Sequence, residues 1–394
     1  MANVSSSNGI EKYPKLRFPN YTEPYKLMEF SKYADVNPKC GKVPNSFYYI
    51  DLECVNAGEI KDLRIEMAET APSRAQRLLT LYDILFQTVR PYQKNNYHFK
   101  AENDLPTVAS TGYAVFRTEQ SSEYLYELIH TKRFLSDIMK RCTGTSFPAV
   151  SSSEIEDIAI WIPEFQEQKK IGDFLTLVDT KIAKQRMLIE HLKKYKRGLN
   201  IRLLSGISMS YSKRLGDVCS IIGGGTPDTT TAKFWDGGIN WFTPSEIGKT
   251  KYVVSSVRSI SYDGMLKSSA KLLPQNTVLL TTRATLGEMS ILHAEATTNQ
   301  GFQSLIPSNE LLAEYVYYLQ VIIKPWCEKY ASGNTFREIS KSALSNCVIP
   351  VPDISIQNKI VRVLSGIDQH IERENDILDK LREQKKALLQ QLFI

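Results

Sequence analysis

The chain has no long apolar run and no cluster of cysteine or histidine. Its 394 residues include six cysteines and five histidines, all dispersed, without a Cys-x-x-Cys pair. Scattered cysteines of this kind do not suit a zinc site and are typical of reduced thiols in a cytoplasm. The start lacks the apolar core of a signal peptide, and no stretch approaches the roughly 18 apolar residues of a membrane span. These absences predict a soluble cytoplasmic protein without a metal site or a membrane partner.

Motifs of common catalytic sites are missing as well. Pro-Pro does not occur, so the chain lacks the Asn- or Asp-Pro-Pro-aromatic run with which an adenine methyltransferase grips a flipped base. The Gly223–Gly225 run precedes Thr226 and Pro227 instead of opening a helix, which predicts a turn and not a dinucleotide loop. We therefore expect no catalytic residue and no cofactor in this chain.

Charge is nearly balanced, with 49 basic and 43 acidic residues. This mild basic excess permits a polyanionic partner without requiring one. Its distribution is uneven, because residues 166–205 carry ten basic and four acidic side chains, whereas residues 355–394 carry seven and six. A solvated helix face and a phosphate-facing surface both explain the local excess, and both stay open.

The chain does contain one stretch twice. Residues 144–205 align without a gap on residues 333–394, and sixteen of the sixty-two positions are identical. The identical pairs include Gly144 with Gly333, Phe147 with Phe336, Pro163 with Pro352, Gln168 with Gln357, Asp179 with Asp368 and Leu203 with Leu392. A repeat this long indicates two copies of one module and not a solenoid, whose periods run to about 20 to 50 residues.

Each copy follows a more variable segment of similar organisation. Short apolar or aromatic runs between turn residues predict strands, and apolar residues three and four apart predict helices. The predicted strands lie at 47–52, 82–91 and 106–117 in the first half and at 239–247, 276–287 and 297–307 in the second, followed by helices at 122–141 and around 310–330. This alignment places Gly301 opposite Gly112 and Arg283 opposite Arg90.

The fold class is accordingly α+β, with two globular domains in a pseudo-twofold repeat and two long helices. The expected parts are a flexible N-terminal arm at 1–22, a first domain at 23–163, a long helix at 164–205, a second domain at 206–352 and a second long helix at 353–394.

In both long helices a heptad spacing of four and three residues continues from end to end, and we call these positions the seam. Its positions in the first helix are Ile171, Leu175, Val178, Ile182, Gln185, Ile189, Leu192, Lys196, Leu199 and Leu203. In the second helix they are Ile360, Leu364, Ile367, Ile371, Glu374, Leu378, Leu381, Lys385, Leu388 and Leu392. Polar residues interrupt both seams at the same two places, and such interruptions commonly set register and orientation.

We expect the two helices to pair antiparallel, as a coiled coil in which residue numbers of facing positions add to 570. Lys196 then faces Glu374, and Gln185 faces Lys385. A helix of nearly forty residues is about 55 to 60 Å long, so it would separate two domains by more than the roughly 34 Å of one DNA turn. The alternative is that each helix merely covers its own domain.

Several phrases then resemble one family. They are APSRAQRLL at 71–79, DILFQTVRPYQKN at 83–95, GGGTPDTTTAKFWDGGINWFTPSEI from 223, TVLLTTRATLGEMSI from 277, TNQGFQSLIP from 298 and GNTFREISKSAL from 333. With the helix pattern QNKIVRVLSGID they resemble the specificity subunits of type I restriction-modification systems, over nearly all of residues 25–394.

The resemblance implies a subunit without catalysis of its own. In that family each variable domain is a target recognition domain for one half of a bipartite double-stranded DNA site, and the paired helices fix the spacer. The helices also dock two methyltransferase subunits, which methylate adenine with S-adenosylmethionine, and a motor and nuclease subunit can join for restriction. S-adenosylmethionine would thus belong to the partner and not to this chain.

DNA readout needs Arg, Lys, Asn and Gln at base edges and small hydroxyls at phosphates. Candidates in the first domain are Ser73, Arg74, Arg77, Thr88, Arg90, Tyr92 and Lys94. Those in the second domain are Thr226, Lys233, Trp235, Thr243, Ser245, Arg283, Thr285, Asn299, Gln300 and Gln303. For Arg90 and Arg283 a structural salt bridge is an equal alternative, and for Trp235 and Trp241 a core position is the alternative.

Two other functions remain to be compared. One is a coiled-coil interaction scaffold without DNA readout, and the other is an enzyme acting alone. Selective retardation of one duplex at moderate salt separates DNA recognition from the scaffold, because unspecific binding weakens with salt.

Overall fold

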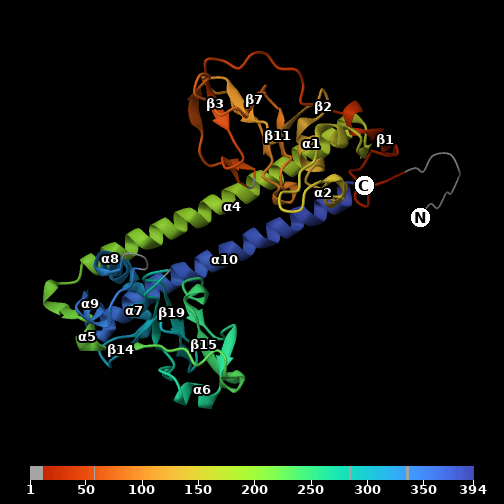
Figure 1. Cartoon of the computed structure of the whole chain (residues 1–394). Helices are drawn as coiled ribbons and strands as arrows, with labels where there is room; N and C mark the ends of the chain where they lie inside the picture. The colour runs from red at the N-terminus through yellow and green to blue at the C-terminus, as the bar shows by residue number, and fades with distance from the viewer. Residues whose placement is uncertain (1–11, 57, 284, 334–336) are drawn as a thin grey trace. The chain divides into compact units, whose positions relative to one another are not determined.

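The two longest helices are α4, Phe165–Ser205, and α10, Ile354–Leu392 (Figure 1). Both lie within two residues of their predicted bounds. The computed structural model describes residues 12–394 except 57, 284 and 334–336. The chain divides inside both helices: the first unit comprises the residues up to Arg186 with Asp376–Ile394, and the second comprises Met187–Asn375. Each unit is therefore one mixed α and β globule with a segment of both long helices.

The first unit contains two four-stranded sheets. The order in one is β6-β3-β10-β7, and in the other it is β2-β11-β8-β9. Their bounds are β6 Arg64–Met67, β3 Ser46–Ile50, β10 Thr107–Ser110, β7 Ala75–Leu78, β2 Asp35–Val36, β11 Tyr113–Arg117, β8 Ile84–Gln87 and β9 Tyr97–His98. The short hairpin β4 Val55–Asn56 and β5 Glu59–Ile60 completes this globule.

Two predictions for the first unit were too coarse. The strand expected at 106–117 is two strands in different sheets, because the turn at Thr111 and Gly112 carries the chain from β10 to β11. The helix expected at 122–141 is also two, α1 Ser122–Leu128 and α2 Lys132–Arg141, since the hydroxyl of Thr131 accepts a hydrogen bond from the backbone of Phe134 and caps a new helix.

The second unit contains a five-stranded sheet, β14-β21-β18-β19-β16, and a three-stranded sheet, β17-β15-β20. Their bounds are β14 Cys219–Gly223, β21 Gln303–Pro307, β18 Val278–Leu280, β19 Met289–Leu292, β16 Tyr252–Val253, β17 Arg258–Ile260, β15 Trp235–Phe242 and β20 Thr297–Thr298. Its helices are α5 Leu215–Val218, α6 Tyr262–Leu266, α7 Ala313–Tyr318, α8 Gln320–Tyr330 and α9 Lys341–Ser345.

The identical residues of the repeat perform the same task in both units. The buried amide of Gln168 donates to the carbonyl of Pro163 at 2.9 Å, and Gln357 donates to Pro352 at 2.8 Å, just where α4 and α10 begin. Each long helix is preceded by the same elements, a short helix and a strand: α3 Ser152–Glu156 and β12 Ala159–Ile162, then α9 and β22 Val348–Pro350. The repeat is thus a structural module that starts a long helix.

The segments that pack at the C-terminal ends of the two long helices are also organised alike. After α4, the backbone N–H of Gly206 donates to the carbonyl of Arg202, and the chain then forms β13 Ser212–Arg214, which pairs with β22. In the first unit, the N–H of Leu16 donates at 3.0 Å to the carbonyl of Gln391 in α10, and β1 Lys26–Glu29 pairs with β12. The N-terminal segment therefore lies at the end of α10 in the same way that residues 206–211 lie at the end of α4.

This capping corrects the prediction of a flexible arm at 1–22. Residues 1–11 lie outside the described residues, but residues 12–22 are held in place. The guanidinium of Arg17 donates to both oxygens of the fully buried Glu167, at 2.9 and 2.7 Å, and the ring of Phe18 meets that of Phe174 edge-on at 5.6 Å. A buried carboxylate requires such a partner, which is why the polar segment is ordered.

Within each unit, segments of α4 and α10 lie side by side with opposed directions (Figure 1). None of the twenty seam residues is exposed. Ile171 and Leu175 of α4 share one apolar core with Leu392 and Phe393 at the end of α10. The seam and the antiparallel direction are confirmed, and each helix also covers its own globule, so the two alternatives do not exclude each other.

The predicted register is wrong by about one heptad. Lys196 forms an ion pair with Asp368 instead of Glu374, and Lys385 pairs with Asp179 at 2.6 Å instead of facing Gln185. The residue numbers of both pairs add to 564 and not to 570. Because these aspartates directly follow seam residues Ile367 and Val178, facing seam positions add to 563. A heptad pattern alone cannot distinguish shifts of seven residues.

The two ion pairs sit in different surroundings. The hydroxyl of Tyr318 donates to Asp368 at 2.6 Å in the second unit, whereas in the first unit Glu127 of α1 is a second carboxylate on Lys385, at 3.0 Å. Burial raises the pKa of Glu127 to about 8, with the nearby Asp179 adding to the shift against the opposing effect of Lys385. Burial lowers the pKa of Lys385, but the two carboxylates outweigh it, so that this pKa is raised.

Crosslinking checks the register in the first unit. Cysteines replacing Ile182 and Leu381 are expected to form a disulfide under mild oxidation, because these seam positions face each other in the observed register. Cysteines replacing Ile182 and Leu388, the pair of the originally predicted register, are expected not to. Mobility on non-reducing gels measures both, with single substitutions as controls, and the reverse pattern would refute the observed register.

Glu127 makes stability depend on pH. Its folded pKa of about 8 lies above the ordinary value of 4.5, so its favourable contribution is present at low pH and is lost as pH rises through about 8. The free energy of unfolding of wild type is expected to fall by on the order of 1 kcal/mol or more between about pH 6 and 9 because of this group. Glu127→Gln, which mimics the protonated acid, is expected to lack this fall. Denaturant unfolding measures both proteins.

The matched control for this experiment is Glu119→Gln, a change at an exposed position. It is expected to leave the pH dependence of wild type intact. A constant destabilisation of Glu127→Gln at every pH would mean that Glu127 is ionised in the folded protein throughout this range.

Candidate nucleic-acid interface

Three loops of the first unit meet at the ends of its strands. The backbone N–H of Thr111 donates to the carbonyl of Arg74 at 2.8 Å, and Thr88 donates to the carbonyl of Gly112 through both its N–H, at 3.1 Å, and its hydroxyl, at 2.9 Å. Ser73 and Arg74 are exposed on the first of these loops. The structure therefore brings the predicted residues Ser73, Arg74 and Thr88 onto neighbouring loops.

Arg90 lies on the same group of loops in an unusual conformation. Its φ is 55°, its N–H donates to the carbonyl of Pro148 at 2.7 Å, and its guanidinium stands 4.3 Å above the ring of Phe147. Non-glycine residues with positive φ carry strain and are often found at functional sites. Tyr92, two residues on, is half-exposed. The turn thus presents a fixed arginine and an accessible phenol.

Phe147 was missed as part of this site. It is 62% exposed and supports the guanidinium of Arg90. The one available signal was the identity of Phe147 with Phe336 in the repeat, whereas its exposure is visible only in the structure. Phe336 itself lies outside the described residues.

Two predicted residues of the first unit do not lie freely at this surface. Arg77 is half-buried in β7, and its Nε has no hydrogen-bond partner among the described residues. Lys94 is half-buried with φ 56°, and its ammonium lies 3.5 Å from the carbonyl oxygen of His130. Burial, and then the charge of Lys386, lower the pKa of Lys94.

The corresponding loops of the second unit are drawn together by a glycine. The N–H of Gly225 donates to the carbonyl of Thr298 at 2.8 Å, and the N–H of Asn299 donates to that of Phe242 at 3.1 Å. A Cβ on Gly224 would lie 2.0 Å from the carbonyl oxygen of Asn299. Only glycine permits this approach. The predicted turn at 223–225 is wrong: Gly223 ends β14, and Gly224 and Gly225 form a close contact between strand ends.

Most predicted residues of the second unit gather around this contact. The hydroxyl of Thr226 donates to Gln300 Oε1 at 2.5 Å, and that of Thr285 donates to the carbonyl of Pro244 at 3.4 Å. Thr243 and Ser245 share a hydrogen bond of 3.1 Å between their hydroxyls. Thr226, Thr243, Ser245, Thr285, Asn299 and Gln300 thus lie on adjoining loops.

The equivalence of Arg90 and Arg283 is wrong by one position. The N–H of Thr282 donates to the carbonyl of Gly301 just as the N–H of Thr88 donates to that of Gly112. Arg90 is two residues beyond Thr88, whereas Arg283 is one beyond Thr282. The two arginines therefore occupy different positions relative to this shared hydrogen bond and are not counterparts.

Arg283 takes the salt-bridge alternative. Its guanidinium lies 2.9 Å from the carboxylate of Glu338, and both side chains are partly exposed. An exposed pair of this kind contributes little to stability, typically about 0 to 1 kcal/mol. Glu338 was not foreseen, because nothing in the spacing of the sequence links it to Arg283.

Of three further candidates, Gln303 pairs with Gly223 beside this contact, whereas Trp235 and Lys233 lie elsewhere. Trp235 is 9% exposed and packs edge-on against the buried Trp241 at 5.1 Å, so the core alternative holds for both rings. Gln303 is half-buried on β21, and Lys233 is exposed on a short 3-10 helix, Ala232–Phe234. Trp235 is therefore removed from the candidate interface.

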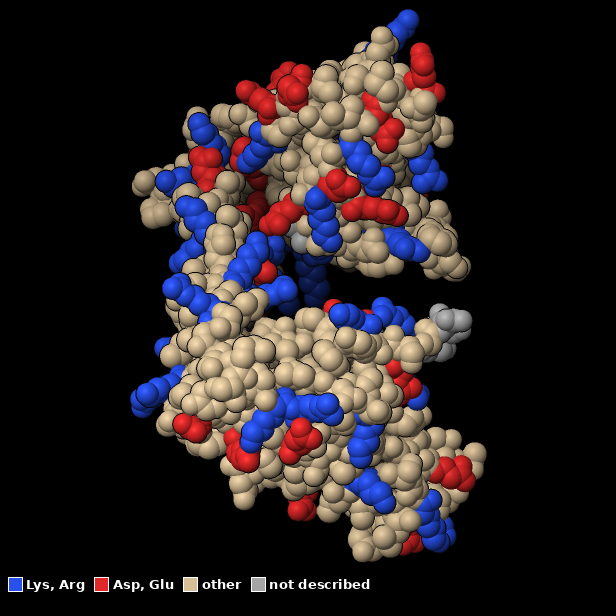
Figure 2. Space-filling view, turned by 90° about the vertical axis from the view of Figure 1, so that its left-hand side faces the viewer, with Lys and Arg blue, Asp and Glu red and all other residues tan. Residues whose placement is uncertain are grey.

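Basic side chains are dense along the long helices in the view of Figure 2, whereas both signs of charge are mixed over the globular parts. Eight of the ten basic residues in 166–205 are exposed. They are Lys169, Lys170, Lys181, Lys184, Lys193, Lys194, Arg197 and Arg202. Within the described parts of the chain, no group of three or more His, Cys, Asp or Glu could hold a metal ion. No helix there could cross a membrane.

A family model described as the type I restriction modification DNA specificity domain matches residues 82–194 and 210–383. The chain belongs to this family. Most of the first matched segment lies in the first unit, and most of the second lies in the second unit.

Two relatives of known family are similar to parts of the chain. The type I restriction enzyme MjaIX specificity subunit of Methanocaldococcus jannaschii is 35% identical over 176 residues, 43% of this chain and 41% of the relative. The EcoR124I/EcoR124II specificity subunit of Escherichia coli is 29% identical over 45% of this chain and 47% of the relative. The chain thus spans less than half the length of these curated relatives.

A solved structure supports the fold over the whole chain. It is described as the structural basis underlying complex assembly and conformational transition of the type I R-M system. It covers 96% of this chain and 99% of its own, with a TM-score of 0.64 and 23% identity.

Gln300 offers a direct test of the second-unit surface. Thr226 donates to its carbonyl oxygen, so its exposed NH₂ remains available to a base acceptor. If this surface recognises DNA, Gln300→Ala is expected to weaken binding of the recognised duplex by about 1 to 3 kcal/mol, measured by gel retardation. Gln275→Ala, at another exposed position, is the control. Equal affinities of both variants would remove Gln300 from the interface.

Proposed function

We propose that the chain is the DNA sequence-recognition subunit of a type I restriction-modification complex. Each unit recognises one half of a bipartite double-stranded site through the loops at its strand ends. The observation that carries the proposal is the repeat itself, since the family match covers two units that share a helical module but hold different polar side chains on equivalent loops.

The side chains on these loops suit DNA readout. In the first unit Ser73, Arg74, Thr88 and Arg90 lie on neighbouring loops, and in the second Thr226, Thr243, Asn299 and Gln300 do. Hydroxyls and backbone amides contact phosphates, whereas Arg, Asn and Gln hydrogen-bond to base edges. Membership of the family indicates that these loops bind DNA, and their side chains are of the types that DNA recognition requires.

The partners are methyltransferase subunits, two in number, that dock on the long helices. Support comes from apolar side chains of α4 that face solvent: Met187 is 60% exposed, Leu188 42% and Tyr195 61%, all within the second unit. Exposed apolar groups on one helix mark a protein interface. Adenine methylation with S-adenosylmethionine belongs to these partners, and a motor and nuclease subunit joins the same complex for restriction.

The experiment is to map methylated adenines in a genome that carries this chain and its methyltransferase. We expect one bipartite motif with a fixed spacer. Replacing residues 206–352 by the corresponding segment of a relative is expected to change one half of the motif and leave the other half and the spacer unchanged.

Two results would contradict the proposal. Methylation of a continuous motif, or of the same motif after the exchange, would show that the two units do not each recognise a half-site. Methyl transfer by the purified chain alone would instead identify an enzyme. The control lacks this chain and is expected to show no methylation at the motif.

A further inference from the structure

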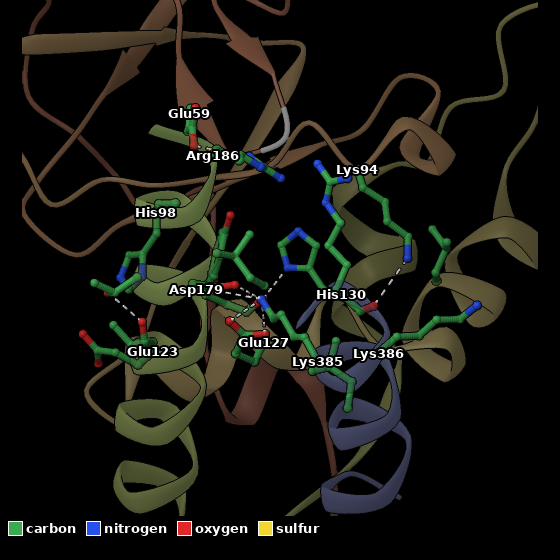
Figure 3. Close-up of a pocket in the computed structure, with 18 of the residues that line it drawn as sticks. Glu59, Lys94, His98, Glu123, Glu127, His130, Asp179, Arg186, Lys385 and Lys386 are labelled. Atoms are coloured by element: carbon green, nitrogen blue, oxygen red, sulfur yellow. Dashed lines mark hydrogen bonds and ion pairs between the residues drawn. The ribbon is translucent and has the colours of Figure 1, made fainter. Parts of the chain in front are cut away.

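A pocket of about 730 Å³ lies inside the first unit, where α1, α2, α4 and α10 meet (Figure 3). Its volume is in the range of sites that hold small molecules, about 300 to 1,000 Å³. Apolar groups from Leu135, Ile182 and Leu389 form part of its wall, together with the rings of Tyr126 and His130. The pocket has the size and mixed lining of a ligand site.

Every acidic group that lines this pocket has a cationic partner in the protein. Glu59 pairs with Arg186 at 3.3 Å, and Glu123 pairs with Lys100 at 3.3 Å. Glu127 and Asp179 share Lys385. Each carboxylate of the lining is therefore already held by a lysine or arginine of the protein.

Three lysines of the lining have no carboxylate partner among the described residues: Lys94, Lys132 and Lys386. Lys94 follows β8, Lys132 opens α2, and Lys386 lies in α10. Lys94 and Lys386 lie on the same side of the pocket in Figure 3. Lys94 is half-buried, and its pKa is lowered by burial and by the charge of Lys386. An anion between these lysines would relieve both effects.

His130 adds polarity without charge. Its Nδ1 lies 2.6 Å from the carbonyl oxygen of Tyr126, so it is the nitrogen that carries the proton, and its Nε2 lies 3.2 Å from the amide of Asn96. Burial lowers the pKa of His130 to about 4. His130 therefore adds no positive charge. Arg186 and Arg382 also line the pocket, but they pair with Glu59 and Asp379, which leaves the three lysines as its unpaired cations among the described residues.

We propose that this pocket binds a phosphate group through Lys94 and Lys386, with Lys132 at its rim. Phosphate presents several charged oxygens to ammonium groups that approach from different elements, as these lysines do. The same chemistry has two sources, a backbone phosphate of duplex DNA or a small phosphorylated molecule. The DNA source rests on the proposed function, because Lys94 ends the loop that holds Arg90 and Tyr92.

The first arm of the experiment uses the full chain without DNA. Adenosine diphosphate is titrated into wild type and into Lys94→Gln/Lys386→Gln, and binding is followed by calorimetry. The matched control is Lys26→Gln/Lys380→Gln, which removes two exposed lysines outside the pocket. If the source is a small molecule, we expect saturable binding to wild type and to the control. Lys94→Gln/Lys386→Gln, the pocket variant, is then expected to lose affinity by about 10-fold or more.

The second arm measures duplex binding by the complex with its methyltransferase subunits over a range of salt. If the source is DNA, the pocket variant is expected to bind more weakly and to lower the slope of log affinity against log salt by about 2, whereas the control retains the slope. This outcome, with no diphosphate binding, assigns the pocket to the DNA backbone.

Phosphate binding at this pocket is overturned if the pocket variant equals its control in both arms. If the wild-type complex binds no duplex selectively, the proposed function is refuted. The diphosphate titration would still show whether the pocket binds phosphate. Circular dichroism of both double variants confirms that they fold, and malonate binding as tightly as the diphosphate would also overturn the phosphate assignment.

Discussion

The antiparallel pairing of the apolar seams of α4 and α10 is the constraint on which the rest of the structure depends. Helices of this length expose a continuous apolar stripe unless another helix covers it. All twenty seam residues are removed from full exposure, and the ends of the stripe merge with the cores of the globules, as Leu392 and Phe393 do in the first unit. The globules and the helices therefore share their hydrophobic cores.

The polar interruptions of the seam add information that apolar residues cannot provide. A shift of seven residues preserves every apolar contact of a heptad pattern, so burial alone leaves the register open. A lysine at the interface needs a carboxylate partner, and across the helix pair Lys196 finds Asp368 and Lys385 finds Asp179. The environment then differs between units, since Glu127 stands by one pair and Tyr318 by the other. The two copies of the repeat thus form equivalent ion pairs in different electrostatic surroundings.

The candidate interface depends on a different constraint, the close approach of strand ends. Gly224 lets one loop touch the backbone of Asn299, and Gly112 accepts two hydrogen bonds from Thr88. Rigid strands hold these loops, while the side chains on them differ between units. Under the proposed function, this separation of scaffold and contact residues would let two related domains recognise different sequences.

The sequence by itself determined the repeat, the two long helices, the seam and the α+β class, because these depend on periodicity that survives without any knowledge of partners. It also determined the family. Tertiary structure alone decided the register, the pairing of Arg283 with Glu338, the burial of Trp235 and the ordering of residues 12–22 by Glu167. Each of these is set by contacts between residues far apart in the chain, for which local pattern carries no distance. The same holds for the pocket, whose lysines come from three separate elements and acquire a common site only when the chain folds.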